Sequence, residues 1–295
     1  MLFSKKTAWQ KRADFRSALK SNKLLRFPGA FSPLVSMLID QIGFDGVYIS
    51  GAALSNDLGL PDIGLTTLGE VSMRGRAIAR VTDLPTIIDM DTGFGEAINV
   101  ARSIHEVEEL GLCGGHIEDQ VNPKRCGHLN KKILVDVELM TLKVRAAAEA
   151  KHDPNFMLIA RTDARSVEGL DQAIERARAY VDAGADMIFP EALTDEKEFE
   201  AFRKAIHVPL LANMTEFGKS KLLSFEQLQN LGYSIVIYPV TALRLAMKAI
   251  EDGLASILVE GSQAHLLDKM QHRKRLYEIL RYEDYNQFDR DIFNF

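Results

Sequence analysis

Eight short apolar runs recur along the chain, and a segment of helical pattern follows each one. Strands that alternate with helices indicate βαβ units and a parallel sheet, and continuous apolar runs are typical of strands buried on both faces. Eight evenly spaced units over roughly 240 residues predict a (β/α)8 TIM-type barrel rather than a doubly wound sheet. The runs are residues 24–30, 47–50, 86–91, 115–119, 156–162, 187–191, 209–214 and 235–239.

The two ends of the chain add helices to this barrel. Residues 1–20 are basic and amphipathic, which favours a helix that caps the domain with Trp9, Ala13, Phe15 and Leu19 partly buried; a mitochondrial presequence is the alternative. Further helices are expected from 241 to about 281, before a tail rich in aromatic residues. Such a tail should dock on the barrel or on a neighbouring subunit. No linker interrupts the pattern, so we expect one domain over residues 1–295.

Composition excludes several classes of function. The 295 residues are 46% hydrophobic and carry a net charge of −5, which gives no sign of a nucleic-acid or membrane surface. No apolar run approaches the roughly 20 residues that a membrane helix needs. The two cysteines are too few for a disulfide framework and indicate a reducing compartment, which we expect to be the cytoplasm.

Polar residues stand at the ends of the expected strands, where barrel enzymes build their active sites. Asp89 and Asp91 are two residues apart in an extended segment, so their side chains should share one face. Two neighbouring carboxylates repel each other unless a cation joins them or one takes a proton. With Glu118 at the end of the next strand, the pattern favours Mg²⁺ over helix capping or loop hydrogen bonds.

The segment Lys124-Arg125-Cys126-Gly127-His128 places a thiol between two cations and an imidazole, with a glycine that lets the backbone bend. A cysteine near such cations has a favoured thiolate and should exchange protons near neutral pH. Residues 121–132 contain few apolar anchors and many positive charges. We therefore expect this segment to be a mobile lid that closes over a polyanionic substrate.

Three arginines and one turn are candidates to bind substrate carboxylates. Arg161, Arg244 and Arg273 offer the bidentate guanidinium fork, although a surface salt bridge is the common fate of an arginine. Arg161, directly after an apolar run, is the strongest of the three, and Arg273 is the weakest. The turn Ser50-Gly51-Ala52 either supplies backbone N–H donors to an anion or is simply a tight connection.

These motifs, taken together, resemble the isocitrate lyase/phosphoenolpyruvate mutase superfamily. The resemblance rests on the segment 124–128 and on the segments 89–95, 117–120 and 160–163, and it extends from about residue 15 to 285. The cysteine block is specific for the lyase branch, because the mutase branch lacks that cysteine. One departure is Ala52, where the family often has a second glycine; a methyl group there would narrow the pocket slightly.

The resemblance implies a Mg²⁺-dependent retro-aldol cleavage of 2-methylisocitrate, a tricarboxylate, to pyruvate and succinate. It implies a barrel whose last helix is swapped between the subunits of a homotetramer. It implies Cys126 as the acid that protonates the succinate carbanion, Tyr48 as a candidate base, and Lys124 and His128 as further catalytic residues. It assigns the metal to Asp89 and Asp91, with Glu118 and Asp62 around it. Substrate contacts are implied for Ser50, Gly51, Ala52, Gly127, Arg161, Glu191, Asn213, Met214, Thr215, Arg244 and Arg273.

Other members of the superfamily remain open as alternatives. Isocitrate lyases resemble the cysteine block but are usually longer, with bulkier aromatics where this chain has Phe189 and Ile237. Relatives that cleave 2,3-dimethylmalate share the motifs, and those that hydrolyse oxaloacetate tend to carry serine where this chain has Pro239. A catalytically inactive barrel scaffold is the alternative outside enzymes, and the intact Cys126, Asp89 and Arg161 disfavour it.

Overall fold

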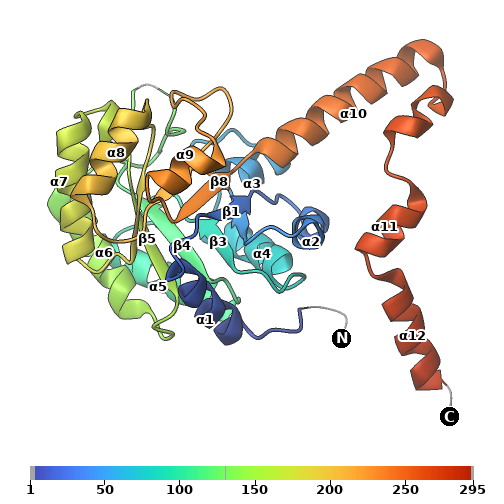
Figure 1. The fold of residues 1–295 in the computed structure, drawn as a ribbon, viewed down its shortest axis with the longest axis horizontal. Helices are drawn as coiled ribbons and strands as arrows, with labels where there is room; N and C mark the ends of the chain where they lie inside the picture. Colours follow the sequence, from blue (N-terminus) through green and yellow to red (C-terminus); the bar gives the residue numbers. More distant parts are fainter. Residues whose placement is uncertain (1–3, 130, 294–295) are drawn as a thin grey trace.

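Eight parallel strands form the centre of the computed structural model, which describes residues 4–129 and 131–293 (Figure 1). Strands β2 to β6 pair in sequence order, and β1, β8 and β7 form a second ladder. Single bridges between Gly29 and Tyr48 and between Ile188 and Leu210 join the two ladders. The barrel is therefore closed, as the eight runs predicted. The strands are β1 Leu25–Pro28, β2 Val47–Ile49, β3 Thr86–Asp89, β4 Gly114–Glu118, β5 Met157–Thr162, β6 Met187–Pro190, β7 Leu211–Asn213 and β8 Ile235–Tyr238.

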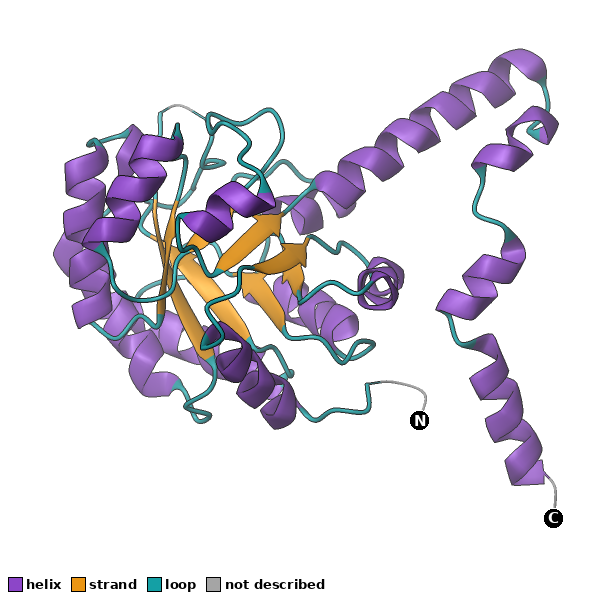
Figure 2. Cartoon of the chain, in the orientation of Figure 1, coloured by secondary structure: helices purple, strands orange, loops and turns teal. Residues whose placement is uncertain are grey.

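With the exception of the last three, which form a separate arm, the helices of the chain surround this barrel (Figure 2). They are α1 Ala8–Leu19, α2 Pro33–Ile42, α3 Gly51–Asp57, α4 Leu68–Ala79, α5 Ala97–Glu109, α6 Val137–Ala150, α7 Leu170–Asp182, α8 Glu196–Ala205, α9 Phe225–Asn230, α10 Thr241–Glu260, α11 Arg273–Ile279 and α12 Tyr282–Phe293. Their apolar faces explain this layer: α7, for example, buries Ala173, Ile174, Ala177 and Tyr180. None of the helices in the described part of the chain is both long and apolar enough to cross a membrane.

The apolar side chains form two separate cores. One lies between the sheet and the helices. The other fills the barrel and contains Phe27, Tyr48, Ile87, Phe189 and Ile237. Alternate residues of a strand point to opposite faces, so strands such as β3, with Ile88 in the outer core and Ile87 in the interior core, contribute to both. The interior core fills the barrel beneath its polar mouth and gives the functional side chains a rigid floor.

Helix α1 closes the lower end of the barrel, but its buried face differs from the expected one. Phe15 packs into the interior core, with its ring centroid 5.5 Å from that of Phe27. Trp9 and Ala13 are exposed, so the expectation of their burial was wrong. Arg12 is buried instead, because its guanidinium pairs with Asp153 at 3.2 Å and donates to the carbonyl of Leu112 at 2.8 Å. The helix is held as much by buried polar contacts as by apolar ones.

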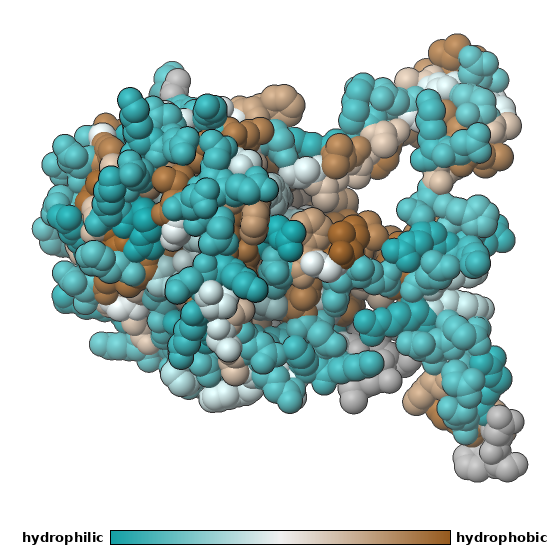
Figure 3. Space-filling view, in the orientation of Figure 1, coloured by the Kyte–Doolittle hydropathy of each residue, from teal (hydrophilic) through white to brown (hydrophobic). Residues whose placement is uncertain are grey.

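The C-terminal arm, residues 241–293, leaves the barrel. In a (β/α)8 barrel each helix normally packs against the strand before it, yet α10 projects outward and buries none of its residues (Figure 1). Leu245, Leu254 and Leu258 on it are 69%, 63% and 87% exposed, and apolar side chains are visible along the arm (Figure 3). The arm returns at α11, where Gln41 of α2 donates to the carbonyl oxygen of Ile279 at 3.1 Å.

Candidate active site

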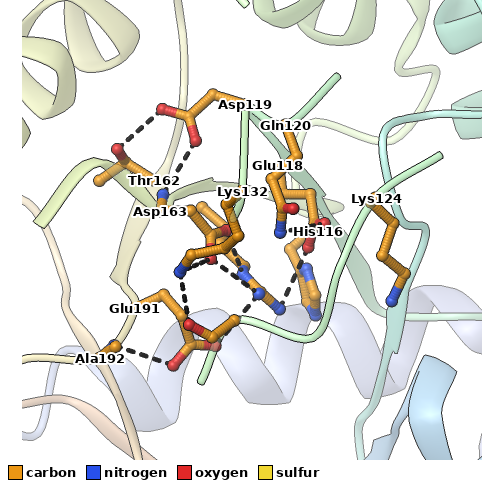
Figure 4. Close-up of polar contacts among 12 residues, drawn as sticks. His116, Glu118, Asp119, Gln120, Lys124, Lys132, Thr162, Asp163, Glu191 and Ala192 are labelled. Carbon is orange, nitrogen blue, oxygen red and sulfur yellow. Dashed lines mark hydrogen bonds and ion pairs between the residues drawn. The ribbon is translucent and has the colours of Figure 1, made fainter. Parts of the chain in front are cut away.

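Charged and polar side chains converge at the carboxyl ends of the strands, as the sequence predicted. Asp89 ends β3, Glu118 ends β4 and Arg161 lies near the end of β5, and all three are buried. Glu191 and Asn213 join them from β6 and β7. Parallel strands present their carboxyl ends at the same mouth, and Figure 4 shows the cluster at this end of the barrel.

Arg161 is the centre of this cluster. Its guanidinium lies 3.0 Å from Asp163, 3.1 Å from Glu118 and 3.3 Å from Glu191, and it sits over the ring of Phe189 at 5.2 Å. Burial alone would raise the pKa values of Asp163 and Glu191, but Arg161 and Lys132 together, with His128 in addition at Glu191, hold both below their usual values. The guanidinium is thus fixed by three carboxylates and serves as a rigid positive centre.

A second group gathers around the paired aspartates. Asp89 accepts hydrogen bonds from the backbone N–H of Gly51 at 3.1 Å and of Asp91 at 3.0 Å. Lys124 Nζ lies 2.9 Å from Asp91 Oδ1 and also pairs with Asp62. The N–H of Gly51 is therefore engaged by Asp89 rather than free for a substrate anion. Ser50 caps α3, since its hydroxyl accepts from the N–H of Ala53. A Cβ at Gly51 would approach Asp89 Oδ2 to 2.9 Å, so only glycine fits.

Burial changes the charge states of this group. It raises the pKa of Asp91 to about 6, because Lys124 offsets only part of the burial and Asp89 and Asp62 repel a further negative charge. Burial would lower the pKa of Lys124, but Asp91, Glu118 and Asp62 raise it well above its usual value. Lys124 thus holds its proton firmly, whereas Asp91 takes one up under mildly acidic conditions.

Cys126 contradicts the expected thiolate. Burial raises the pKa of its thiol, and the backbone N–H of His128 opposes this shift only in part. The two preceding cations point elsewhere: Lys124 pairs with aspartates, and Arg125 donates to the carbonyl oxygens of Pro123 and Lys124. A thiol that keeps its proton at neutral pH can act as an acid, which is the role that the resemblance implies.

Two neighbours of Cys126 fix the segment against the barrel. His128 Nε2 lies 3.0 Å from Glu191 Oε1, and His128 Nδ1 accepts from the backbone N–H of Lys219 at 2.9 Å. A Cβ at Gly127 would lie 2.4 Å from both Arg161 Nη2 and Glu191 Cγ. Gly127 is not among the residues of positive φ, so it is needed for this close approach and not, as expected, for a bend.

Tyr48 lies deeper than a residue that touches substrate would. It is 2% exposed, and its hydroxyl lies 2.8 Å from His116 Nε2, while His116 Nδ1 is 3.7 Å from Asp89. Burial raises the pKa of Tyr48 well above its usual value, so its hydroxyl retains its proton. This disfavours Tyr48 as a base. His116 lies between Tyr48 and the metal-binding candidate Asp89, although its Nδ1 makes no hydrogen bond in the described structure.

Several buried polar residues were missed in the sequence. Asp119 accepts from the hydroxyls of Thr162 and Tyr180, each at 2.8 Å, and from the N–H of Asp163 at 2.9 Å. Lys132 lies 2.8 Å from Asp163. The sequence position of Asp119 could have identified it as a site residue, since it directly follows Glu118 at a strand end. Lys132 and Tyr180 carried none, because they reach the site from a loop and from helix α7.

The remaining candidates lie at different distances from this cluster. Asn213 donates to Glu191 at 3.3 Å, and Met214 and Thr215 follow it in buried positions. Arg244 lies at the start of α10 and pairs with Glu216 at 2.8 Å. Arg273 is exposed on α11, which contacts α2 on the outside of the barrel. Within one chain, therefore, Arg273 is not brought to the mouth.

Phe189 and Ile237, the positions where isocitrate lyases carry bulkier aromatics, lie below the mouth of the barrel. Both are fully buried in the interior core, and the ring of Phe189 packs edge-on against His116 with centroids 5.4 Å apart. They form the floor beneath Arg161 rather than a wall in contact with substrate. Pro239 is buried as well, and its carbonyl oxygen leaves no room for a Cβ at Gly29.

A divalent cation fits the charges at the mouth. The carboxylates of Asp62, Asp89, Asp91, Glu118, Asp163 and Glu191 outnumber the permanent cations Lys124, Lys132 and Arg161. Asp91 Oδ1 and Glu118 Oε2 accept no hydrogen bond within the described structure, although each lies near a cation. No three described carboxylate, histidine or cysteine side chains form a preformed metal cage. Mg²⁺ needs none, because it keeps several waters and binds through one or two carboxylates.

Comparison with known proteins agrees with this geometry. The chain is 58% identical over 287 residues to "Probable 2-methylisocitrate lyase 1" of Corynebacterium glutamicum, covering 97% of this chain and 94% of that protein. It is 46% identical to the 2-methylisocitrate lyase of Aeropyrum pernix, covering 94% of this chain and 89% of the relative.

Solved structures show the same fold at lower identity. A 2,3-dimethylmalate lyase matches with a TM-score of 0.90 and 31% identity over 98% of this chain and 96% of its own. Oxaloacetate acetylhydrolase with 3,3-difluorooxalacetate matches with 0.91 and 32%, over 97% and 98%. Phosphonopyruvate hydrolase with oxalate and Mg²⁺ matches with 0.87 and 30%, over 98% and 100%.

The family model described as "Phosphoenolpyruvate phosphomutase" matches residues 15–258, which span the whole barrel and the beginning of the arm. With the (β/α)8 fold, the strand-end carboxylates and the near full-length relatives, this match identifies the chain as a member of the isocitrate lyase/phosphoenolpyruvate mutase superfamily.

Proposed function

We propose that this chain is a Mg²⁺-dependent carbon–carbon lyase that cleaves 2-methylisocitrate to pyruvate and succinate, a step of propionate breakdown by the methylcitrate cycle. The observation that carries the proposal is Cys126, a half-buried thiol that keeps its proton and directly precedes Gly127, which packs against the fixed guanidinium of Arg161. Relatives named for this activity, 58% and 46% identical over nearly the whole chain, support it.

Substrate binding is assigned to the positive and polar groups of the mouth. Arg161 supplies a positive centre that does not move, because three carboxylates hold it. Further substrate contacts are assigned to Asn213 and Thr215 at the end of β7, and to Ser50 and Ala52 after β2; the N–H of Gly51 is already bonded to Asp89. Asp89 and Asp91 would hold Mg²⁺, with Glu118 and Asp62 nearby. The metal, when bound, supplies positive charge to the hydroxyl and carboxylate oxygens of the pyruvate half.

Proton delivery is assigned to Cys126. The tertiary hydroxyl of the substrate gives its proton to a base and its C–O bond becomes the carbonyl of pyruvate. The electron pair of the broken C–C bond stays on the succinate half, and that carbanion takes the proton of the Cys126 thiol. The raised pKa of the thiol favours this role, since the proton stays on sulfur until the carbanion forms. Gly127 and His128 hold the segment against Arg161 and Glu191 and so exclude water from the carbanion.

The assembly is proposed to be a homotetramer with the last barrel helix exchanged between subunits. Helix α10 leaves the barrel with its apolar residues exposed, and a contiguous apolar face of this kind is typical of an interface. Exchange would also offer Arg273 a place near a neighbouring site. Both cysteines are free, which suits a reducing cytoplasm where the Cys126 thiol persists.

A substrate panel tests the proposal. Purified protein with Mg²⁺ is given 2-methylisocitrate, isocitrate, 2,3-dimethylmalate and oxaloacetate in turn, and the products are identified by mass spectrometry. We expect pyruvate and succinate from 2-methylisocitrate, and loss of the activity in chelator. A higher kcat/KM for any other substrate would overturn the substrate assignment, and no turnover of any of them would favour an inactive scaffold.

A further inference from the structure

Lys132 is the most unusual buried charge that the proposed reaction does not use. It belongs to the loop between β4 and α6, yet its side chain is only 1% exposed. Its Nζ lies 2.8 Å from Asp163 Oδ1 and donates a second hydrogen bond to the carbonyl oxygen of Gly127. Figure 4 shows the ammonium of Lys132 turned toward Asp163 beneath the loop.

The carboxylate of Asp163, which pairs with Lys132, is itself held in place by other residues. The same Oδ1 that pairs with Lys132 also accepts from Arg161 Nη2 at 3.2 Å, and Oδ2 accepts from Arg161 Nε at 3.0 Å. The backbone N–H of Asp163 donates to Asp119, which Thr162 and Tyr180 hold in turn. Lys132 and the substrate-binding Arg161 therefore share one immobile carboxylate.

Gly127 places the other end of the contact next to Cys126. Its carbonyl belongs to the residue directly after the proposed acid, and its Cα faces Arg161 and Glu191 with no space for a side chain. One ammonium thus bridges the backbone that carries Cys126 and the carboxylate that orients Arg161. The bridge sets the distance between the acid and the anion-binding centre.

We infer that Lys132 is a positioning residue that holds Cys126 in register with Arg161. The inference depends on the proposed function only for the roles of those two residues. An anchor for a loop alone would not need a charge, because a buried lysine has a large desolvation cost and an apolar side chain would hold the loop as well. Donors are needed here because both partners, a carboxylate and a carbonyl, are acceptors, and the positive charge is needed because the carboxylate of Asp163 is negative.

The test compares Lys132→Met with Lys131→Met. Both changes remove one positive charge from the same loop, but the Lys131 side chain is exposed. We expect Lys132→Met to lower kcat by about 10²-fold with little change in KM, because displacement of a reacting group by about 1 Å has an effect of this size. Lys132→Arg should restore part of kcat. Equal kcat values for the two methionine variants would overturn the inference.

A second measurement does not depend on turnover. The rate at which iodoacetamide alkylates Cys126, followed by peptide mass spectrometry, should be higher in Lys132→Met than in Lys131→Met because the segment is no longer held. If Lys132→Met fails to fold, Lys132→Gln, which keeps a donor but not the charge, replaces it in both measurements. Equal alkylation rates would contradict the inference. Absence of lyase activity in the wild type would refute the proposed function but leave this comparison valid.

Discussion

The barrel and the C-terminal arm use apolar and charged residues in opposite ways. In the barrel, charges as deep as Arg161 and Asp163 are buried and paired, and apolar residues such as Phe189 have no exposed surface. In the arm, α10 buries nothing, and Leu258 is 87% exposed. The barrel buries its apolar residues and pairs its deepest charges within one chain, whereas the arm leaves its apolar residues uncovered. Chemistry and assembly are therefore separate tasks of separate regions, and substitutions can test each one alone.

Replacement of Cys126 by serine should have the largest effect and should be confined to barrel chemistry. A hydroxyl is a far weaker acid than a thiol, and a positioned acid contributes about 10²–10⁴-fold to rate. We expect turnover to fall by that amount while the thermal midpoint and the oligomeric state stay unchanged. Steady-state kinetics and calorimetry would measure this. Cys113→Ala, in the interior core, is the control that should retain turnover.

Truncation of Ile237 should reveal the barrel as the source of folding stability. Ile237 is fully buried in the interior core, so Ile237→Ala should cost about 2–5 kcal/mol of unfolding free energy. Denaturant titration at two protein concentrations would measure it, and we expect the loss to be the same at both. A loss that depended on concentration would place Ile237 in an assembly interface instead.

A charge introduced in the arm should change the assembly but not the folding of the barrel. Leu254 is 63% exposed on α10, so Leu254→Asp should leave the barrel folded but shift the assembly toward smaller species. Sedimentation velocity across a dilution series would show the change. Glu260→Ala, an exposed polar position on the same helix, is the matched control. An unchanged sedimentation profile for Leu254→Asp would mean that this part of α10 faces solvent in the assembly.

The smallest effect is expected from pH, and only in the barrel. The pKa of Asp91 is raised to about 6 from its usual 3.8, so the folded protein binds this proton more tightly than the unfolded chain does. The contribution of Asp91 to stability therefore falls as pH rises between 3.8 and about 6.

Mg²⁺ competes with the proton for Asp91, so the affinity of the site for Mg²⁺ should fall as pH drops through about 6. Calorimetric titration of Mg²⁺ between about pH 5 and about pH 8 would measure this dependence. A flat profile would remove Asp91 from the metal site.

The fold could be predicted because its signals are local. Each of the eight apolar runs overlaps a strand of the barrel, with ends that differ by at most a few residues. Asp89, Asp91 and Glu118 could be found as candidates because carboxylates at strand ends meet at one mouth. The prediction of a thiolate at Cys126 was wrong because it relied on the residues next to it in the sequence. Lys124 and Arg125 stand beside Cys126 in the chain but turn away from it, and burial raises the pKa of the thiol.

Other parts of the site depend on contacts between distant segments. Lys132 reaches Asp163 across 31 positions, and Tyr180 reaches Asp119 across 61. No periodic pattern marks such residues, because a single long side chain makes the contact. The residue pattern alone could not predict the outward path of α10, since an amphipathic helix after β8 could pack on its own barrel or on another; only the family resemblance implied that the last helix leaves its barrel.

Because Gly127 has no side chain, the loop that carries Cys126 packs directly against Arg161 and Glu191. A methyl group there would overlap Arg161 and Glu191, so Gly127→Ala would change neither charge nor proton inventory but would prop the segment open by the width of one carbon atom. The size of the side chain at position 127 therefore sets the distance between the Cys126 thiol and the substrate carbanion. Over evolutionary time this position should tolerate only glycine, whereas Cys126 beside it is constrained by chemistry alone.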